Sequence, residues 1–332
     1  MSLLLVDNLK TNFHIDAGKV QAVRGVSFHV NKGESIGIVG ESGSGKSVTM
    51  LSIMGLLPDN ASIEVAGMSF NGIDMEMMDY KQWRRLHGRE IGMIFQDPMT
   101  SLNPLLTIGH QIMEPMRIHL KLSKKDAKKR AIEMLKLVDI PSPENRINQY
   151  PHELSGGMRQ RVMIAIAISC NPKLLIADEP TTALDVTIQA QILDLMSDLK
   201  KKINTSIVMI THDLGVIASM CSRVIVMYGG IIVEEGTIRE VFYNPQHPYT
   251  WGLIRSIPKV EMGERKKLIP IPGTPPDLLA PPKGCPFAAR CEYAMKVCEM
   301  IPPRNTVISN THQAACWLMH PKAPKVDKGV IG

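Results

Sequence analysis

Residues 40–47, with the sequence GESGSGKS, have the residue types and spacing of a phosphate-binding loop. Glycines let backbone N–H groups curl around phosphates, and the start of a following helix adds partial positive charge. Lys46 can neutralise phosphate, and the Ser47 hydroxyl can coordinate magnesium. A glycine-rich structural turn is the alternative. The apolar run 35–40 before the lysine predicts a buried strand and a helix is expected over 46–57, an order that favours nucleotide binding.

An acidic pair, Asp178 and Glu179, follows four apolar residues. The apolar run predicts a buried strand, and ligands bind at the carboxyl ends of strands in open α/β sheets. Asp178 therefore suits a magnesium ligand, and Glu179 could polarise a water for attack on a γ-phosphate. A solvated strand end is the alternative, which a phosphate-binding loop in the same chain makes the weaker one.

A third candidate is Ser155, which precedes two glycines and a segment rich in Val, Ile and Ala that predicts a helix. Backbone amides and the dipole at a helix start form an anion site. Ser-Gly-Gly alone is a common helix cap. Because this segment lies in the chain between the phosphate-binding loop and the acidic pair, we interpret it as an anion site.

The elements that must position these residues are those of an α/β protein with a helical insertion. Further buried strands are expected over 173–178 and 206–211, and the helical spacing between them implies a parallel sheet. Residues 223–235 predict a hairpin that turns at two glycines. Between about 98 and 172 the pattern is helical, with Ser123 and Asp126 spaced as a capping box.

Length and composition limit the class of protein. The 332 residues suffice for about two cores. Hydrophobic residues make up 44% and charged residues 21%, as in soluble globular proteins. The longest mainly apolar run, residues 162–170 with a single serine, is far shorter than the ~18–20 residues of a membrane span. The first residues lack the basic start of an export signal, so we expect the chain to stay in the cytosol.

The net charge of +6 arises after residue 254, where twelve Lys or Arg face six Asp or Glu. The preceding part is balanced, so nucleic-acid binding is not expected for it. Twelve of the 23 prolines also lie beyond residue 255, where they should forbid long helices and interior strands. These shifts indicate two regions with a boundary near 240–258.

The motifs together resemble the ATP-binding cassette family from residue 3 to about 240. The segment 154–158 (LSGGM) resembles the family signature, with Met158 in place of the usual glutamine. The resemblance implies a P-loop NTPase fold, with a mixed sheet core, a β-subdomain and an α-helical subdomain. We therefore expect an ATPase domain over 1–243, with its helical subdomain over about 98–172, and a C-terminal extension rich in Pro and Cys over 244–332.

The resemblance also assigns roles to residues. It implies that Gln96 links nucleotide to a transmembrane partner and joins Ser47 and Asp178 at Mg²⁺, and that His212 contacts the γ-phosphate. The implied catalytic residues are Glu179, His212, Gln96 and Lys46. Phe13 is expected to stack on adenine, with His14 as a rival. The expected ATP contacts are Phe13, Ser42, Gly43, Ser44, Gly45, Lys46, Ser47, Val48, Gln96, Asp178, Ser155, Gly157 and Asp185, the last at the end of the segment 182–185.

In this family each ATP lies between the phosphate-binding loop of one subunit and the signature of another. The chain has one of each, so the resemblance implies a dimer with an identical or a homologous second ATPase subunit. ATP and Mg²⁺ are then the cofactors.

Residues 244–250 (NPQHPYT), followed by Trp251, resemble the hallmark of the dipeptide and oligopeptide branch of importer ATPases, which includes nickel importers. A proline-capped turn that starts a helix is the structural alternative. We expect an ATP-hydrolysing subunit on the cytoplasmic face of the membrane that powers peptide import through two permease subunits, with an extracytoplasmic peptide-binding protein as an indirect partner. Nickel import is the alternative.

Four cysteines, Cys285, Cys291, Cys298 and Cys316, lie within 32 residues. Cytosolic thiols clustered in this way indicate a metal site rather than disulfides. The absence of C-x2–4-C pairs disfavours Zn²⁺, and the wider spacing favours an iron–sulfur cluster. Peptide-branch relatives with a similar tail carry a 4Fe-4S cluster, which supports that choice. Zn²⁺ or free thiols are the alternatives. The role of a cluster would be either to stabilise the fold of the extension, as a structural staple, or to regulate transport by redox change.

The sequence disfavours two other classes of protein. A cassette protein that acts on nucleic acid or the ribosome commonly carries two cassettes or a coiled-coil arm, and this sequence has neither. An iron–sulfur scaffold with a vestigial cassette is disfavoured by the intact Lys46, Asp178, Glu179 and His212.

Overall fold

The computed structural model describes residues 2–182, 184–257 and 270–327, which divide into two compact units. Unit 1 contains Val30–Ser35 and Met75–Ile210. Unit 2 contains Ser2–His29, Ile36–Asp74 and the chain from Thr211 onward. The expected α/β class is confirmed, because both units combine helices with sheet.

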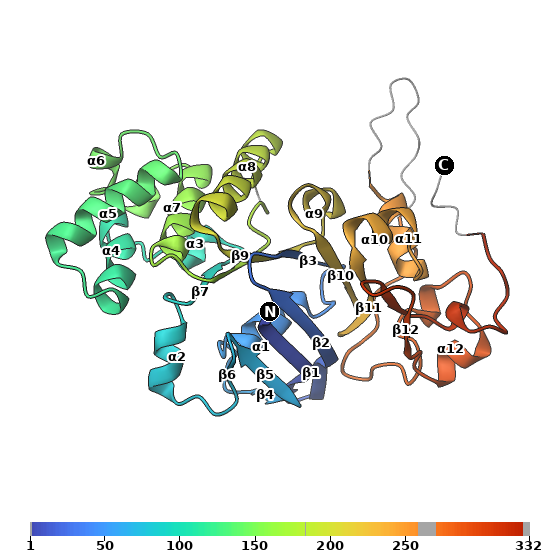
Figure 1. Cartoon of the computed structure of the whole chain (residues 1–332). Helices are drawn as coiled ribbons and strands as arrows, with labels where there is room; N and C mark the ends of the chain where they lie inside the picture. Colours follow the sequence, from blue (N-terminus) through green and yellow to red (C-terminus); the bar gives the residue numbers. More distant parts are fainter. Residues whose placement is uncertain (1, 183, 258–269, 328–332) are drawn as a thin grey trace, which may run out of the picture. The chain divides into compact units, whose positions relative to one another are not determined.

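An antiparallel sheet in unit 2 is built from residues 2–74 (Figure 1). Its strands have the order β2-β1-β5-β6, and β4 also pairs with β1. Strand β1 buries Leu4, Val6, Leu9 and Thr11, and the Thr11 hydroxyl contacts the Ser52 hydroxyl of helix α1 at 2.7 Å. The bounds are β1 Ser2–Ile15, β2 Gly18–Asn31, β4 Ala61–Glu64, β5 Gly67–Phe70, β6 Ile73–Asp74 and α1 Lys46–Ile53.

The helix expected over 46–57 ends at Ile53. Gly55 lies just beyond with a left-handed backbone (φ 60°), a conformation that commonly closes a helix.

The second set of strands in unit 2 has the order β12-β13-β11-β10-β3. Strand β3 runs parallel to β10, and the predicted hairpin is present as β10 and β11. The bounds are β3 Ser35–Val39, β10 Arg223–Tyr228, β11 Ile231–Thr237, β12 Asn305–Val307 and β13 Gln313–Ala315.

The C-terminal extension contributes an interior strand, which corrects the expectation from its prolines. Strand β13 lies between β11 and β12, with Glu234 opposite Ala314. The prolines at 302, 303, 321 and 324 flank the two short strands and do not interrupt them. The extension therefore continues a sheet that the preceding region begins.

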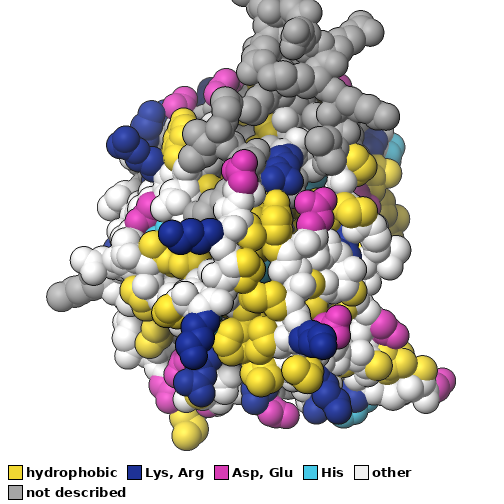
Figure 2. All heavy atoms as spheres, turned by 90° about the vertical axis from the view of Figure 1, so that its right-hand side faces the viewer, with side chains coloured by type: hydrophobic (Ala, Val, Ile, Leu, Met, Phe, Trp, Pro, Cys, Tyr) yellow, Lys and Arg dark blue, Asp and Glu magenta, His cyan; other side chains and the backbone are white. Residues whose placement is uncertain are grey.

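The helices of unit 2 after residue 211 are short. They are α9 Leu214–Met220, α10 Ile238–Tyr243, α11 Pro248–Arg255 and α12 Lys296–Met300, with 3-10 turns at Ala288–Arg290 and Trp317–Met319. Helix α11 starts at Pro248 with His247 as its N-cap, so the proline-capped turn is confirmed. Figure 2 shows a face on which hydrophobic side chains lie among both basic and acidic ones.

Unit 1 has a short parallel sheet with the order β7-β8-β9 and a group of helices. The buried runs fall at β8 and β9 as predicted, and Ser123 caps α5 by accepting from the Asp126 N–H. The bounds are β7 Ile91–Ile94, β8 Leu174–Asp178, β9 Ser206–Thr211, α2 Tyr80–Leu86, α3 Pro98–Ser101, α4 Ile108–His119, α5 Lys124–Leu137, α6 Pro143–Arg146, α7 Gly156–Ile168, α8 Val186–Ile203 and a 3-10 turn at Pro151–Glu153.

No helix in the described part of the chain is long and apolar enough to cross a membrane.

Replacement of Gly92 by Ala should destabilise unit 1, because a Cβ there would lie 2.3 Å from the Ala167 carbonyl oxygen of α7. Overpacking against backbone should lower the free energy of unfolding by about 2 kcal/mol. Urea unfolding followed by circular dichroism measures this change. Gly67→Ala is the control, since its Cβ would meet only the Asp7 Cβ at 3.9 Å. Equal midpoints for the two variants would contradict the prediction.

Candidate functional site

The predicted phosphate-binding loop connects β3 to α1 in unit 2. Gly43 and Gly45 have left-handed backbones, with φ of 77° and 97°. A Cβ on Gly45 would also lie 2.6 Å from the Ala22 carbonyl oxygen, so only glycine fits there. Ser42 and Gly43 are exposed and Ser44 is buried. The loop thus has the curled backbone that the sequence predicted.

Lys46 lies within this loop and is 5% exposed. Its Nζ donates to the carbonyl oxygens of Gly40, at 2.8 Å, and Glu41, at 3.0 Å. The backbone of the loop therefore holds the ammonium group in place. Ser47 and Val48 follow as half-buried residues in the first turn of α1.

The other candidates in unit 2 are Phe13, His14 and His212. Phe13 is half-buried on β1, opposite Ala61 of β4. The neighbouring His14 is exposed and its Nε2 lies 3.1 Å from the Ser62 hydroxyl. His212 is exposed and directly precedes Asp213, whose carboxylate caps α9.

In unit 1 the structure brings Gln96 and Glu179 together. The Gln96 Nε2 donates to the Glu179 Oε2 at 3.1 Å, and the Thr182 hydroxyl donates to the same oxygen at 2.8 Å. Glu179 has a left-handed backbone, with φ of 46°. Such a conformation in a non-glycine residue costs about 1–3 kcal/mol and is concentrated at functional sites. The adjacent Asp178, at the end of β8, is 6% exposed.

Ser155 is the N-cap of α7, and its hydroxyl accepts from the Met158 N–H. Ser155 and Gly156 are exposed, which leaves the start of this helix open to an anion. A Cβ on Gly157 would lie 2.9 Å from the Ile188 side chain of α8. Asp185 caps α8 by accepting from the Ile188 N–H at 3.0 Å, and Ala183 in the same segment lies outside the described residues.

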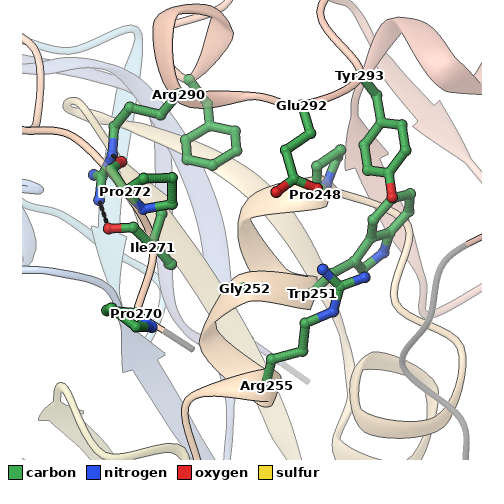
Figure 3. A pocket seen from close by; sticks show the side chains of 11 residues that line it. Pro248, Trp251, Gly252, Arg255, Pro270, Ile271, Pro272, Arg290, Glu292 and Tyr293 are labelled. Atoms are coloured by element: carbon green, nitrogen blue, oxygen red, sulfur yellow. Dashed lines mark hydrogen bonds between the residues drawn. The ribbon is translucent and has the colours of Figure 1, made fainter. Parts of the chain in front are cut away.

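Arg290 of the extension contacts the phosphate-binding loop, a feature that sequence reasoning missed. Its guanidinium forms a two-pronged ion pair with the Glu41 carboxylate, at 2.6 and 3.0 Å. It also donates to the carbonyl oxygens of Ile271 and Pro272, at 3.1 and 2.8 Å, and to the Tyr228 hydroxyl. Figure 3 shows Arg290 directed towards Ile271 and Pro272.

Tyr249 holds the same part of the loop from another side. Its hydroxyl accepts a hydrogen bond from the Glu41 N–H at 2.8 Å. Tyr249 is fully buried, and its ring packs with those of Tyr228 and Phe287, at centroid distances of 4.5 and 5.4 Å. Burial raises the pKa of Tyr249 above its usual value, so its hydroxyl is protonated at neutral pH.

A small pocket of about 50 Å³ lies beside these residues, and Figure 3 shows the side chains that line it. Arg290 lies on one side with Ile271 and Pro272, and Trp251 and Tyr293 lie on the other. Arg290 therefore both lines this pocket and pairs with Glu41.

The four clustered cysteines line one small cavity in unit 2. None of the six cysteines, all of which lie in the described residues, forms a disulfide. Burial, together with a smaller effect of the neighbouring thiols, raises the pKa of Cys285 to about 11 and that of Cys316 to about 12. Of the remaining two cysteines, Cys170 is buried, as expected for a small hydrophobe, whereas Cys221 is half-buried.

No group of three or more His, Cys, Asp or Glu side chains in residues 2–182, 184–257 and 270–327 is arranged to hold a single metal ion. His247 also lines the cysteine cavity. Its Nδ1 accepts from the Tyr249 N–H at 3.1 Å, and its buried Nε2 has no hydrogen-bond partner. Burial lowers the pKa of His247 to about 4, so the ring is neutral with its proton on Nε2.

Comparison with known families gives two matches. Residues 23–182 match the family described as ABC transporter, and residues 233–298 match the C-terminal region of oligopeptide/dipeptide transporters.

Individual proteins are similar over nearly the whole chain. The oligopeptide transport ATP-binding protein OppD of Bacillus subtilis is 58% identical over 98% of this chain and 91% of its own. The dipeptide transport ATP-binding protein DppD of Lactococcus lactis is 55% identical over 98% and 93%. Among solved structures, the dimeric ATP-binding cassette MJ0796 bound to ADP and Pi has a TM-score of 0.64 and 29% identity, over 71% of this chain and 99% of its own.

The metal-free protein should lose stability at alkaline pH through its buried thiols. A thiol with a pKa near 9 in the unfolded chain and about 11 to 12 when folded stabilises the fold fully below pH 9, and this contribution is lost as the pH rises through 11 to 12. Urea midpoints between pH 8 and 10.5 measure the loss. Cys316→Ser should flatten the alkaline decline and Cys221→Ser should not. An unchanged slope in Cys316→Ser would refute the prediction.

Proposed function

The chain belongs to the family of ATP-binding subunits of oligopeptide and dipeptide ABC transporters, ATPases that hydrolyse ATP to drive peptide transport, and we propose that it powers peptide import through a separate membrane permease. The observation that carries this proposal is similarity across both the ATPase region and the C-terminal extension. Because these relatives transport peptides, peptide import is favoured over nickel import and over an action on nucleic acid.

We assign the phosphates of ATP to residues 43–48. The open glycine backbone at Gly43, the amides at the start of α1 and the Lys46 ammonium together offer positive charge to an anion. Phe13 is proposed to stack on adenine and Ser42 to lie beside the phosphates. Ser47, Gln96 and Asp178 would hold Mg²⁺, which neutralises charge on the phosphates when bound.

Glu179 is proposed as the general base that takes a proton from the attacking water. The Gln96 amide and the Thr182 hydroxyl both donate to its Oε2, and so fix the orientation of the carboxylate. His212 is proposed to contact the γ-phosphate, which its exposure permits.

ABC cassettes form dimers, as the cassette MJ0796 does. We propose that Ser155, Gly157 and Asp185 serve the ATP bound to a second, identical or homologous subunit. The exposed start of α7 supports this assignment, since backbone N–H groups in the first turn of a helix have no partner within the helix and can bind an external anion. Two permease subunits and, indirectly, an extracytoplasmic peptide-binding protein complete the proposed assembly at the cytoplasmic face of the membrane.

We propose that the chain divides into an ATPase domain at 1–243, with a helical subdomain at about 98–172, and an extension at 244–332. Helices α3 to α7 fill the proposed helical subdomain. The C-terminal region of oligopeptide/dipeptide transporters begins slightly earlier, at residue 233.

We further propose that Cys285, Cys291, Cys298 and Cys316 hold a 4Fe-4S cluster. A zinc ion needs four ligands about 2.3 Å from one point, whereas a cluster takes one thiolate at each iron. The four thiols line one cavity, and the wide spacing of the cysteines in the sequence favours the cluster over Zn²⁺. The unpartnered Nε2–H of His247 could donate to a cluster sulfur.

Glu179→Gln should bind ATP with unchanged affinity and hydrolyse it at least 100-fold more slowly, because the amide cannot accept the proton of water. Single-turnover hydrolysis and equilibrium ATP binding measure the two properties of the full-length chain. Asp194→Asn changes a carboxylate elsewhere in unit 1 and should behave as the wild type. Turnover of Glu179→Gln within tenfold of the wild type would remove Glu179 as the base.

Anaerobically purified protein should contain about four irons and four acid-labile sulfides per chain. Elemental analysis and the visible absorption spectrum measure this content. Ser replacements of Cys285, Cys291, Cys298 or Cys316 should each reduce it, whereas Cys170→Ser should not. Stoichiometric zinc, or no metal, would overturn the cluster assignment and leave the ATPase assignment intact.

A further inference from the structure

We propose that Arg290 and Tyr249 of the C-terminal extension are positioning residues for the phosphate-binding loop, so that ATP affinity depends on the extension. This inference rests on the proposed role of residues 43–48 in binding ATP. It gives a specific task to the Tyr of the His247-Pro-Tyr motif and to an arginine that precedes Cys291.

Glu41 is the residue on which both contacts converge. Its carboxylate accepts from two nitrogens of Arg290, and its N–H donates to the Tyr249 hydroxyl. Its carbonyl oxygen accepts from the Lys46 Nζ at 3.0 Å and from the Ser44 N–H at 3.2 Å. The side chain and both backbone polar groups of Glu41 are thus engaged.

These bonds form a continuous path from the extension to Lys46. Tyr249 holds the N–H of the Gly40–Glu41 peptide group, whose carbonyl oxygen, that of Gly40, accepts from the Lys46 Nζ. Arg290 holds the Glu41 side chain, and the Glu41 carbonyl oxygen accepts from the same Nζ. A rotation of the Gly40–Glu41 peptide group would move the Gly40 oxygen, one of the two oxygens that position Lys46. The extension therefore determines where the positive charge of the loop is held.

Arg290 is itself rigid, which suits a positioning residue. Its side chain is 5% exposed. The Nε of Arg290 donates to the Pro272 carbonyl oxygen, and the Nη2 donates to the Ile271 carbonyl oxygen as well as to Glu41 (Figure 3). The guanidinium also lies over the rings of Tyr228 and Phe287, at 5.7 and 5.9 Å from their centroids. Lysine could not reproduce this planar, multi-donor arrangement.

Arg290 and Tyr249 both lie close in the sequence to residues that line the cysteine cavity. Arg290 ends the 3-10 turn Ala288–Arg290 and is bonded to Cys291, and Tyr249 lies two residues after His247. Cys291 and His247 both line that cavity. The packing of the cavity therefore fixes the backbone from which Arg290 and Tyr249 reach the loop.

The test is a double-mutant cycle on ATP affinity in the full-length protein. Arg290→Gln and Glu41→Gln should each weaken the binding of MgATP at least fivefold, measured by displacement of a fluorescent ATP analogue. The double variant should bind no more weakly than the weaker single variant, because either change removes the same ion pair. Arg290→Lys should recover only part of the loss.

Tyr249→Phe removes a single hydroxyl and should also weaken binding, by at least twofold, because the Glu41 N–H loses its acceptor. Arg304→Ala is the matched control, since it removes an exposed arginine of the same extension. Its ATP affinity should equal that of the wild type. Iron content and the thermal unfolding midpoint are measured on every variant, so that loss of the fold or of the cysteine site is distinguished from loss of positioning.

Affinity of Arg290→Gln within twofold of the wild type would overturn the proposal, as would losses that multiply in the double variant. If Arg290→Gln does not fold, Glu41→Gln and Tyr249→Phe decide the question, and unchanged ATP affinity in both would overturn it. Lys46→Ala separates this proposal from the ATPase assignment. If folded wild-type protein binds MgATP no better than Lys46→Ala, the assignment of residues 43–48 fails.

Discussion

Glu234 has no exposed surface, so all compensation for its buried carboxylate must come from the protein. One oxygen accepts from the Gln246 N–H and contacts the His312 Nε2, and the other accepts from the His247 N–H. This one side chain on β11 therefore fixes the start of α11 and the strand β13 that follows His312. Tyr249 reaches Glu41 only because α11 begins where Glu234 places it, so the arrangement around the phosphate-binding loop depends on this buried charge.

Local features of the site could be predicted from the sequence because local physics produces them. Five consecutive buried residues make β3 and β8 visible as apolar runs, and the glycines after β3 signal a curled loop. Ser155 is recognisable as a helix cap and Pro248 as the start of a helix, because such signals act within three residues. The family resemblance extended these local patterns to ATP and peptide transport, which the full-length relatives support.

The rest could not be predicted because it depends on pairing between distant segments. Strands β12 and β13 have three residues each, too few for an alternating pattern. Arg290 and Glu41 are 249 residues apart, and neither residue type indicates the other as its partner. The left-handed backbone of Glu179 also has no signature in the sequence, since the strain is imposed by surrounding contacts. The prolines of the extension indicated short elements but not their place in a sheet.

The ion pair between Glu41 and Arg290 also bears on the order in which the molecule is made. Ribosomes add about 5–20 residues per second, so Glu41 is synthesised roughly 12 to 50 s before its partner 249 residues later. During that interval the nascent chain carries the glycine loop and Lys46 but lacks Arg290, and for most of it also lacks Tyr249, which lies 208 residues after Glu41. The loop of a growing chain is therefore unbraced, and its final geometry is reached only after almost the entire polypeptide has been translated.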